Sequence, residues 1–441
     1  MTQIKRLFAL WAVAMMTTGL VAQSNGCNSS YSRFGLGLLS DQSQGFNRSM
    51  GGVAQGFRSG TQVNMLNPAS YSAIDSLTFI FDAGMGLKMG RIKGDGNSIR
   101  VMNTSLEYIN AGLRICRGLG LSFGFVPYST IGYNFNESRR VGSSYTTGQS
   151  ITSQITYYGN GGLHQIYLGL GWNPFHKFSI GANISYLWGD YDHTMSQLFY
   201  EGSGSSSNTN YNTQNEDWTS DMKTYKLDLG VQYPVRLNKD NQLTFGATAT
   251  LGHTIGSDVT LLRYTSKGDT LKHTTSKAFD LPYTIRAGAS WSHKEQLTIG
   301  ADYTMDRWSG CKVPMSESTA TGSGIAIATD QYRNRHHVAL GANYIHHPQV
   351  GGKYRDHIHY RIGASYSTSY VKVNGQNGPD EYSLRAGVGL PLKTTARSLI
   401  NVSAEWLRRA PATGTQIKEN YIMLHIGITF NEKWFEKWKF Q

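Results

Sequence analysis

Beyond residue 21, the sequence contains no apolar run of the roughly 18–20 residues that a membrane-spanning helix requires. Charged residues are also scarce, since Asp, Glu, Lys and Arg make up 16% of the chain, against about a quarter in soluble globular proteins. Hardly any long segment places apolar residues at helical spacing. These deficits argue against a helical membrane protein and against a conventional multidomain soluble protein.

Cysteine is scarce as well. Cys27, Cys116 and Cys311 are an odd number at wide spacing, which implies neither a disulfide framework nor a metal site. Cys27 follows an apolar segment closely enough to raise lipidation as an alternative, but the three residues before it fit a lipoprotein signal poorly.

The N-terminus has the parts of a Sec-type signal peptide. Lys5 and Arg6 precede the nearly uncharged residues 7–21, and Ala22 is a small residue suited to cleavage. An apolar stretch of about fifteen residues is too short to span a bilayer comfortably. We therefore predict that residues 1–22 are removed on export.

Glycine and aromatic residues are abundant, and much of the chain alternates large apolar residues with small or polar ones. Leu119, Leu121, Phe123 and Phe125, for example, share one face, and glycine and serine lie between them. Such a period of two predicts β-strands. Fourteen segments of this kind follow one another, at residues 76–90, 99–116, 119–136, 161–172, 177–192, 220–233, 241–264, 270–292, 296–307, 335–346, 356–372, 380–391, 398–409 and 420–430.

These segments predict an all-β fold: a transmembrane antiparallel β-barrel of about 14 strands in the outer membrane of a Gram-negative bacterium. Such a barrel pairs its backbone groups between strands, and only alternate side chains face lipid. Residues 137–160, 193–219 and 308–334 are long, polar and assigned to the outside, whereas inner turns such as 117–118 are short. The alternative is an exported soluble β-sandwich, but strands of about fifteen residues are long for that fold.

Residues 23–75 lack sustained alternation and precede the barrel of residues 76–430. They contain too few charges for a typical disordered tail, and a barrel of this size has a lumen wider than its own side chains can fill. We predict an N-terminal plug, with a periplasmic module as an alternative. Residues 431–441 form an aromatic and basic periplasmic tail, which fits an interfacial helix, a frayed end or a docking peptide.

Asn67, Pro68 and Ala69 stand immediately before the first strand, and Pro127 interrupts the third. This arrangement resembles the long-chain fatty acid transporter (FadL/OmpP1/TodX-like) family of outer-membrane barrels, and residues 31–37 and 124–132 are similar to its Bacteroidetes-type branch. The resemblance implies a fourteen-stranded barrel with an N-terminal hatch closed by the Asn-Pro-Ala motif, and a side opening at a kinked third strand. No individual ligand-pocket residue can be matched.

The function that the resemblance implies is passive uptake of small hydrophobic, fatty-acid-like molecules, with capture at the outer loops, an apolar pocket beneath them and escape through the side opening into lipid. The main alternative is a non-transporting barrel subunit or scaffold of an outer-membrane secretion or barrel-assembly complex. Partition into lipid, worth about 0.8 kcal/mol per methylene, would drive uptake without an energy source.

Two groups of residues are candidates for this function. A lateral gate is predicted at Phe125, Pro127 and Tyr128, because proline cannot donate to the strand ladder; the alternative is an ordinary rim bulge. The plug residues predicted to contact a ligand, or alternatively only to pack the plug against the wall, are Phe46, Met50, Phe57, Met65, Asn67, Pro68 and Ala69.

Other classes of function have weaker support. No Gly-x-Ser-x-Gly motif or phosphate-binding glycine loop occurs, so neither an enzyme nor a cofactor is predicted. Histidines pair at 336–337, 346–347 and 357/359, which could chelate zinc or copper, but they lack cysteine or acidic partners and fit polar caps at strand ends. The net charge of +12 is dispersed, which favours anionic outer-membrane lipid and lipopolysaccharide over nucleic acid as partners. Other outer-membrane proteins are the remaining candidate partners.

Overall fold

The computed structural model describes residues 28–94, 97–143, 148, 150–175, 177–201, 213–319, 322–347, 353–392, 398–411 and 417–433. The predicted signal peptide, Cys27 and residues 434–441 of the tail lie outside the described residues. No helix in the described part is long and apolar enough to cross a membrane.

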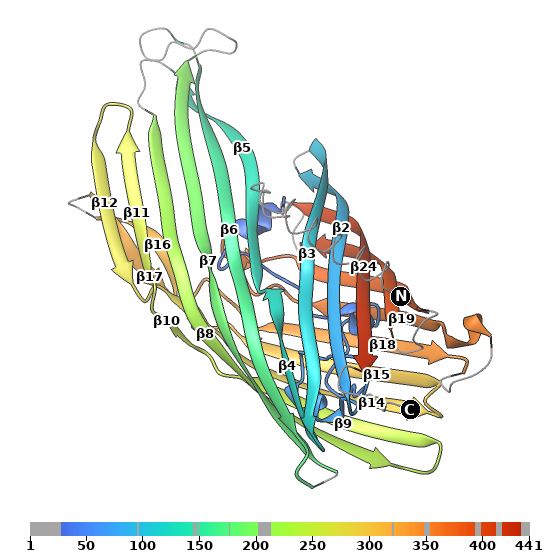
Figure 1. Cartoon of the computed structure of the whole chain (residues 1–441). Coiled ribbons are helices and arrows are strands. Elements are labelled where there is room, and N and C mark those ends of the chain that lie inside the picture. Colours follow the sequence, from blue (N-terminus) through green and yellow to red (C-terminus); the bar gives the residue numbers. More distant parts are fainter. Residues whose placement is uncertain are drawn as a thin grey trace, which may run out of the picture.

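The chain forms a closed antiparallel barrel of 14 strands, which confirms the predicted fold class (Figure 1). Pairing of the last strand with the first, from Thr78↔Lys433 to Lys93↔Lys418, closes it. In chain order the strands are β2 (Thr78–Gly94), β3 (Asn97–Cys116), a third strand divided into β4 (Leu119–Pro127) and β5 (Ser129–Ser143), β6 (Ser150–Trp172), β7 (Ser179–Glu201), β8 (Gln214–Arg236), β9 (Asn241–Thr250), β14 (Tyr283–His293), β15 (Leu297–Arg307), β18 (Arg335–Ile345), β19 (His359–Ser367), β22 (Asp380–Pro391), β23 (Leu399–Ala410) and β24 (Lys418–Lys433).

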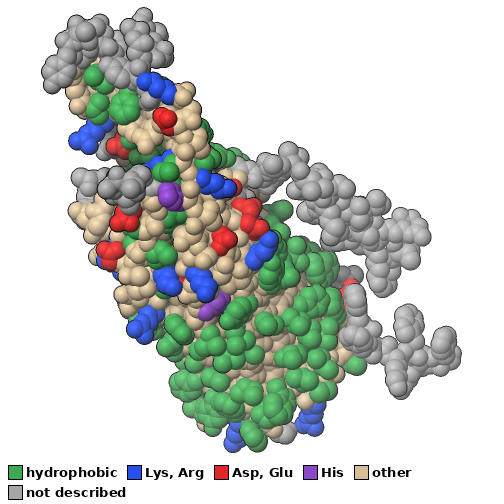
Figure 2. Space-filling view, turned by 90° about the vertical axis from the view of Figure 1, so that its left-hand side faces the viewer, with side chains coloured by type: hydrophobic (Ala, Val, Ile, Leu, Met, Phe, Trp, Pro, Cys, Tyr) green, Lys and Arg blue, Asp and Glu red, His purple; other side chains and the backbone are tan. Residues whose placement is uncertain are grey.

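Alternation of side chains sets the two faces of the wall. On β2, Phe81, Met85 and Met89 are exposed on the outside, whereas Ile80 and Asp82 are buried on the inside. Figure 2 shows the outward apolar side chains as a broad belt across the lower part of the face in view, with most of the charged side chains above it and a few at its lower edge. The belt suits the apolar core of a bilayer.

The outer connections contain more strand than we predicted. The described parts of residues 137–160 and 193–219 belong mostly to strands β5 to β8, and residues 308–334 contain the hairpin of β16 (Val313–Thr319) and β17 (Gly322–Ala328). Above the belt, strands need no apolar outer face, so the sequence signal for them disappears. The remaining short strands are β10 (His253–Ile255), β11 (Asp258–Thr265), β12 (Thr270–Ser276), β13 (Phe279–Leu281), β20 (Lys372–Val373) and β21 (Gln376–Asn377).

At the opposite end the connections are short, except for the longer one that contains the 3₁₀-helix η3 (Tyr354–His357). The segment of residues 28–77, which we call the N-terminal segment, lies within the barrel (blue in Figure 1). Its elements are η1 (Ser30–Arg33), β1 (Leu38–Leu39), α2 (Gly45–Arg48) and η2 (Pro68–Ala73).

Candidate functional site: a broken strand and the segment behind it

The third strand of the barrel is interrupted at Pro127. β4 pairs with β3 only up to the rung Ile109↔Phe125, and β5, which continues the strand, has no pairing with β3 among the described residues. Pro127 lacks the N–H that would continue the ladder. β3 and β5 diverge above this point (Figure 1). We call the gap between their unpaired edges the seam.

The N-terminal segment takes the place of β3 at the base of the seam. β1 pairs with the first two residues of β5, and the N–H of Ser40 donates to the carbonyl of Tyr128 over 2.9 Å. On the other side, the N–H of Tyr128 donates to the carbonyl of Leu163 on β6 over 2.7 Å. Unpaired backbone groups are costly in apolar surroundings, so this contact stabilises the broken edge.

An apolar groove of about 940 Å³ lies on the outer face of the wall. It includes both residues of the last β3–β4 rung, so the base of the seam borders an apolar surface within the belt. Its apolar and aromatic lining comprises Phe79, Phe81, Ile109, Ala111, Phe123, Phe125, Ile166, Tyr167, Leu168, Ile184, Tyr186 and Tyr225.

On the inside, Asn67 joins the N-terminal segment to the wall. Its side-chain Oδ1 accepts from the N–H of Ala69 (3.2 Å) and caps η2, and Pro68 is the first residue of that helix. Its Nδ2 donates to the carbonyls of Gln55 (2.9 Å) and Val231 on β8 (3.2 Å). One amide therefore organises the motif and fastens it to the barrel.

A rung of four glycines receives this motif. Gly120, Gly171, Gly181 and Gly230 are successive Cα partners across β4, β6, β7 and β8. A Cβ atom at Gly181 would collide with the backbone of Pro68, and one at each of the others would collide with atoms of residues 67–72. Because glycine has no Cβ, the N-terminal segment can lie directly on the strands at this rung.

A network of charged side chains inside the barrel joins the N-terminal segment to β3, β22, β23 and β24. Asp41 lies 2.6 Å from Arg385 on β22, which lies 2.9 Å from Glu405 on β23. Arg48 lies 3.2 Å from Glu107 on β3. His425 on β24 bridges Glu107 (2.5 Å) and Glu405 (3.0 Å).

Neighbouring charged side chains determine whether Asp41 is ionised. Burial alone would raise the pKa of this carboxyl, but the guanidinium groups of Arg385 and then Arg48 hold that pKa well below its ordinary range. Asp41 is therefore an anion at neutral pH. The N-terminal segment is held in place by charge as well as by packing.

Replacing Arg385 with methionine should weaken this attachment, because Asp41 and Glu405 would lose the guanidinium that lies between them and keep only Arg48 and His425 as basic neighbours. Removing one partner of a buried ion pair costs about 3–5 kcal/mol. We expect a lower free energy of unfolding in detergent and faster proteolysis within residues 28–77. Lys223→Met, which breaks an exposed pair with Asp221, is the matched control and should change little. Equal behaviour of the two variants would contradict the role of the network.

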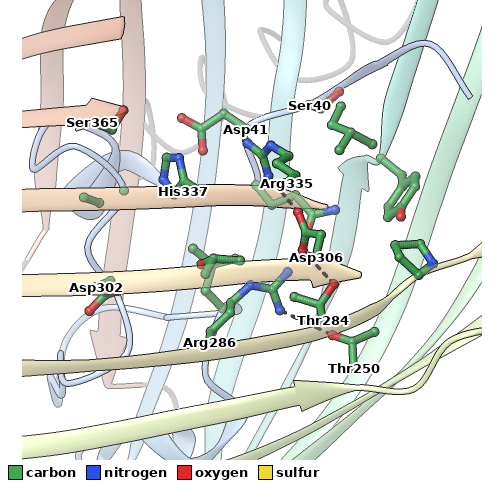
Figure 3. A pocket seen from close by; sticks show the side chains of 18 of the residues that line it. Ser40, Asp41, Thr250, Thr284, Arg286, Asp302, Asp306, Arg335, His337 and Ser365 are labelled. Carbon is green, nitrogen blue, oxygen red and sulfur yellow. Dashed lines mark hydrogen bonds and ion pairs between the residues drawn. The ribbon is translucent and has the colours of Figure 1, made fainter. Parts of the chain in front are cut away.

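Behind the seam lies a cavity of about 140 Å³ that borders Leu39, Ser40 and Tyr128 (Figure 3). Many of the other lining residues are charged, beside apolar ones such as Leu66, Leu281 and Trp308. Arg335 lies 3.0 Å from Asp306, and the lining also includes Asp41, Arg286, Asp302, His337 and Arg385. Asp302 accepts the N–H groups of Ala54 (2.6 Å) and Gln55 (2.8 Å). The charged groups make this cavity more polar than the apolar pocket predicted beneath the outer loops, which stays a prediction.

Apolar side chains border this cavity and continue from it toward the outer end of the barrel. They form a packed cluster whose largest members include Trp308, Phe279, Tyr370 and Leu163, all less than a tenth exposed. A second cavity of about 370 Å³ borders the cluster between the upper strands and the β16–β17 hairpin. Its aromatic lining consists of Phe34, Tyr133, Tyr157, Tyr191, Trp218 and Tyr332, with Arg33 and His193 among them.

The predicted plug residues are mainly packing residues in this structure. Phe46, Met50 and Met65 are buried, and the ring of Phe46 stacks on that of Phe57 with centroids 4.3 Å apart. None of these four side chains lines either cavity. Ligand contact by them stays a prediction. We predicted neither the glycine rung nor the charge network from the sequence. The glycine at the centre of several predicted strands was the one sequence signal for the glycine rung.

The histidine pairs lie apart from this site, except that His337 lines the polar cavity. His346 and His347 face each other near the inner end, with ring centroids 5.1 Å apart. Within the described residues, no group of three or more His, Cys, Asp or Glu side chains is arranged so that it could hold a metal ion.

Comparison with solved structures defines the class of fold. The chain is similar to the CymD monoaromatic hydrocarbon channel (15% identity, TM-score 0.55, covering 88% of this chain and 96% of that one). It is also similar to the Ralstonia pickettii toluene transporter TbuX (16%, 0.56, 91% and 98%) and to a Pseudomonas aeruginosa FadL homologue (12%, 0.59, 88% and 98%). At these identities the likeness establishes the fold, which is that of FadL-like transporter barrels.

The sequence itself gives the family. The BamG family model matches residues 3–441, so the chain belongs to the BamG family. No protein of curated function matches it in sequence. The predicted resemblance to the fatty acid transporter family therefore holds for the fold, and the Bacteroidetes-type branch stays a prediction.

Proposed function

We propose that the protein is an outer-membrane channel for passive uptake of small hydrophobic, fatty-acid-like molecules. In this proposal the N-terminal segment is the plug and the seam is the lateral exit. The observation that carries it is the end of β3–β4 pairing at Ile109↔Phe125, where the broken wall meets the apolar outer groove. A closed barrel has no structural need for such a break.

The aromatic cavity at the outer end is the proposed capture surface, because its rings offer apolar contact above the belt. Residues of the packed cluster line both this cavity and the one behind the seam, and β1 is paired with β5 at the base of the seam. In this proposal, uptake requires the N-terminal segment to move. The pairing between β1 and β5 at the base of the seam must break for that movement. The solute then leaves sideways into lipid, driven by about 0.8 kcal/mol per buried methylene.

Two of the similar structures are a hydrocarbon channel and a toluene transporter, which supports this proposal through fold analogy. Cells that lack endogenous uptake of oleate and toluene should gain it, at least several-fold, when they express this protein. Radiolabel accumulation measures the gain, and a variant lacking residues 28–77 shows how far it depends on the segment. Accumulation equal to that of vector-only cells at matched expression would refute the proposal.

A second candidate is a non-transporting barrel in an outer-membrane assembly or secretion complex. The charged lining and small volume of the cavity behind the seam favour it, and membership of the BamG family points the same way. Purification in mild detergent separates the two. A stoichiometric protein partner together with no uptake supports the complex subunit, and a lone barrel counts against it.

A further inference from the structure

Five exposed basic side chains lie at the upper edge of the apolar belt, on the adjacent strands β23, β24, β2 and β3. They are Arg91, Lys93, Arg100, Arg408 and Lys418, and we call them the rim cluster. Arg91 and Lys93 continue the outward row of β2 that contains Phe81, Met85 and Met89. The cluster therefore faces away from the lumen.

Strand register places these charges against one another. Arg91 is the direct partner of Arg100, and Lys93 is the direct partner of Lys418. Asn420 is paired with both Arg91 and Arg408, so it lies between two basic residues. Like charges directly opposite each other destabilise a sheet, so this arrangement calls for a bound anion.

The protein does not supply that anion within the part described. None of the five side chains forms an ion pair or hydrogen bond with another described side chain, whereas the acidic residues at this end of the same strands point inward. Glu405 pairs with Arg385, and Glu419 pairs with Arg409. No acidic side chain among the described residues neutralises the rim cluster, so its charge is available to an outside anion.

Directly below the cluster, the outward side chains are apolar. Met89 is paired with Met102 on β3 and with Ile422 on β24, which is paired in turn with Trp406 on β23. A ligand seated here meets cations above and an acyl-compatible surface below. The cluster also lies at the end of the long connections, which is the outer side in outer-membrane barrels.

We propose that the rim cluster binds the phosphate of a phosphorylated glycolipid of the outer leaflet, of the lipid A type. The guanidinium groups of Arg91 and Arg100 are suited to phosphate oxygens, and the acyl chains lie along the methionine, isoleucine and tryptophan surface below. This inference rests on the proposed outer-membrane location and is independent of uptake.

The test uses the delipidated mature protein in detergent, with lipid A carrying two phosphates presented in mixed micelles. The variant is Arg91→Gln, Arg100→Gln and Lys418→Gln together. The control is Lys267→Gln, Lys272→Gln and Lys277→Gln, an equal loss of exposed charge around the β11–β12 hairpin. Binding is measured by native mass spectrometry and by thermophoresis, and shifted mobility of unheated protein on gels checks that each barrel is folded.

At about 1 kcal/mol per basic residue near an anionic surface, the variant should bind at least about tenfold more weakly, and the control should bind like the wild type. Dephosphorylated lipid A should bind weakly to all three proteins, and raised salt should weaken wild-type binding. Equal affinity of variant and wild type would overturn the proposal. Equal wild-type affinity for phosphatidylglycerol, or full competition by millimolar inorganic phosphate, would overturn the assignment to a glycolipid.

Discussion

Locking β1 to β5 with a disulfide should abolish uptake of hydrophobic solutes, and reductant should restore it. Leu38 and Thr130 are direct partners in an antiparallel pair, where Cα atoms lie about 4.5–5.5 Å apart, within the range that a disulfide spans. Leu38→Cys with Thr130→Cys, in a background without the three native cysteines, therefore fixes the N-terminal segment at the seam. Oxidised protein should show uptake close to that of vector-only cells.

The matched control places a disulfide where nothing needs to move. Thr260 and Thr274 are direct partners in the β11–β12 hairpin, away from the seam, so Thr260→Cys with Thr274→Cys should leave uptake unchanged in both redox states. Full uptake by the oxidised 38–130 protein would show that β1 does not have to release, and the proposed lateral path would then be wrong.

Replacing Gly181 with valine should displace the N-terminal segment from the wall. A Cβ at this position collides with the backbone of Pro68, which cannot turn aside as a flexible side chain can. Overpacking of this kind costs about 1–3 kcal/mol. The segment lies directly on the glycine rung, so the added side chain has no free space to occupy. We expect rapid proteolysis within residues 28–77 and ion conductance in planar bilayers where the wild type conducts little.

Gly256→Val is the control, because no atom lies within 4 Å of a Cβ at that position. It should match the wild type in both assays. If Gly181→Val also gave wild-type conductance and proteolysis, the N-terminal segment would not depend on the glycine rung and its description as a plug docked there would fail.

The barrel could be predicted from the sequence because contact with lipid imposes a simple alternation of apolar and other side chains. Each strand within the belt needs alternate apolar residues, as at Leu121 and Phe123, and the fourteen segments emerge from that requirement alone. The rule stops at the edge of the belt. The upper part of β7, which ends at Glu201, lies above the belt and faces water or the packed cluster at the outer end of the barrel. Its polar sequence therefore led us to predict a loop there.

The candidate site could be predicted from the sequence only in part, because many of its contacts join residues that are far apart in the chain. Pro127 is a local signal, since a missing N–H breaks a ladder in any context, and Asn67 with Pro68 is a local helix cap. The contacts that hold the segment are not local. Asp41 meets Arg385 because the barrel closes, and no spacing in the sequence relates the two. The polar character of the cavity behind the seam follows from the same long-range assembly.

Photo-crosslinking with a diazirine-bearing fatty acid tests passage through the seam most directly. Cells expressing the wild type and the oxidised 38–130 protein are labelled, and modified peptides are mapped by mass spectrometry. Labelling of Ile362, an exposed belt residue on β19, reports simple contact with lipid and should be equal in both. We predict labelling of Leu39 and Tyr128, inside the seam, in the wild type and its loss in the locked protein. Labelling confined to belt residues such as Ile362 in both proteins would contradict a lateral uptake path.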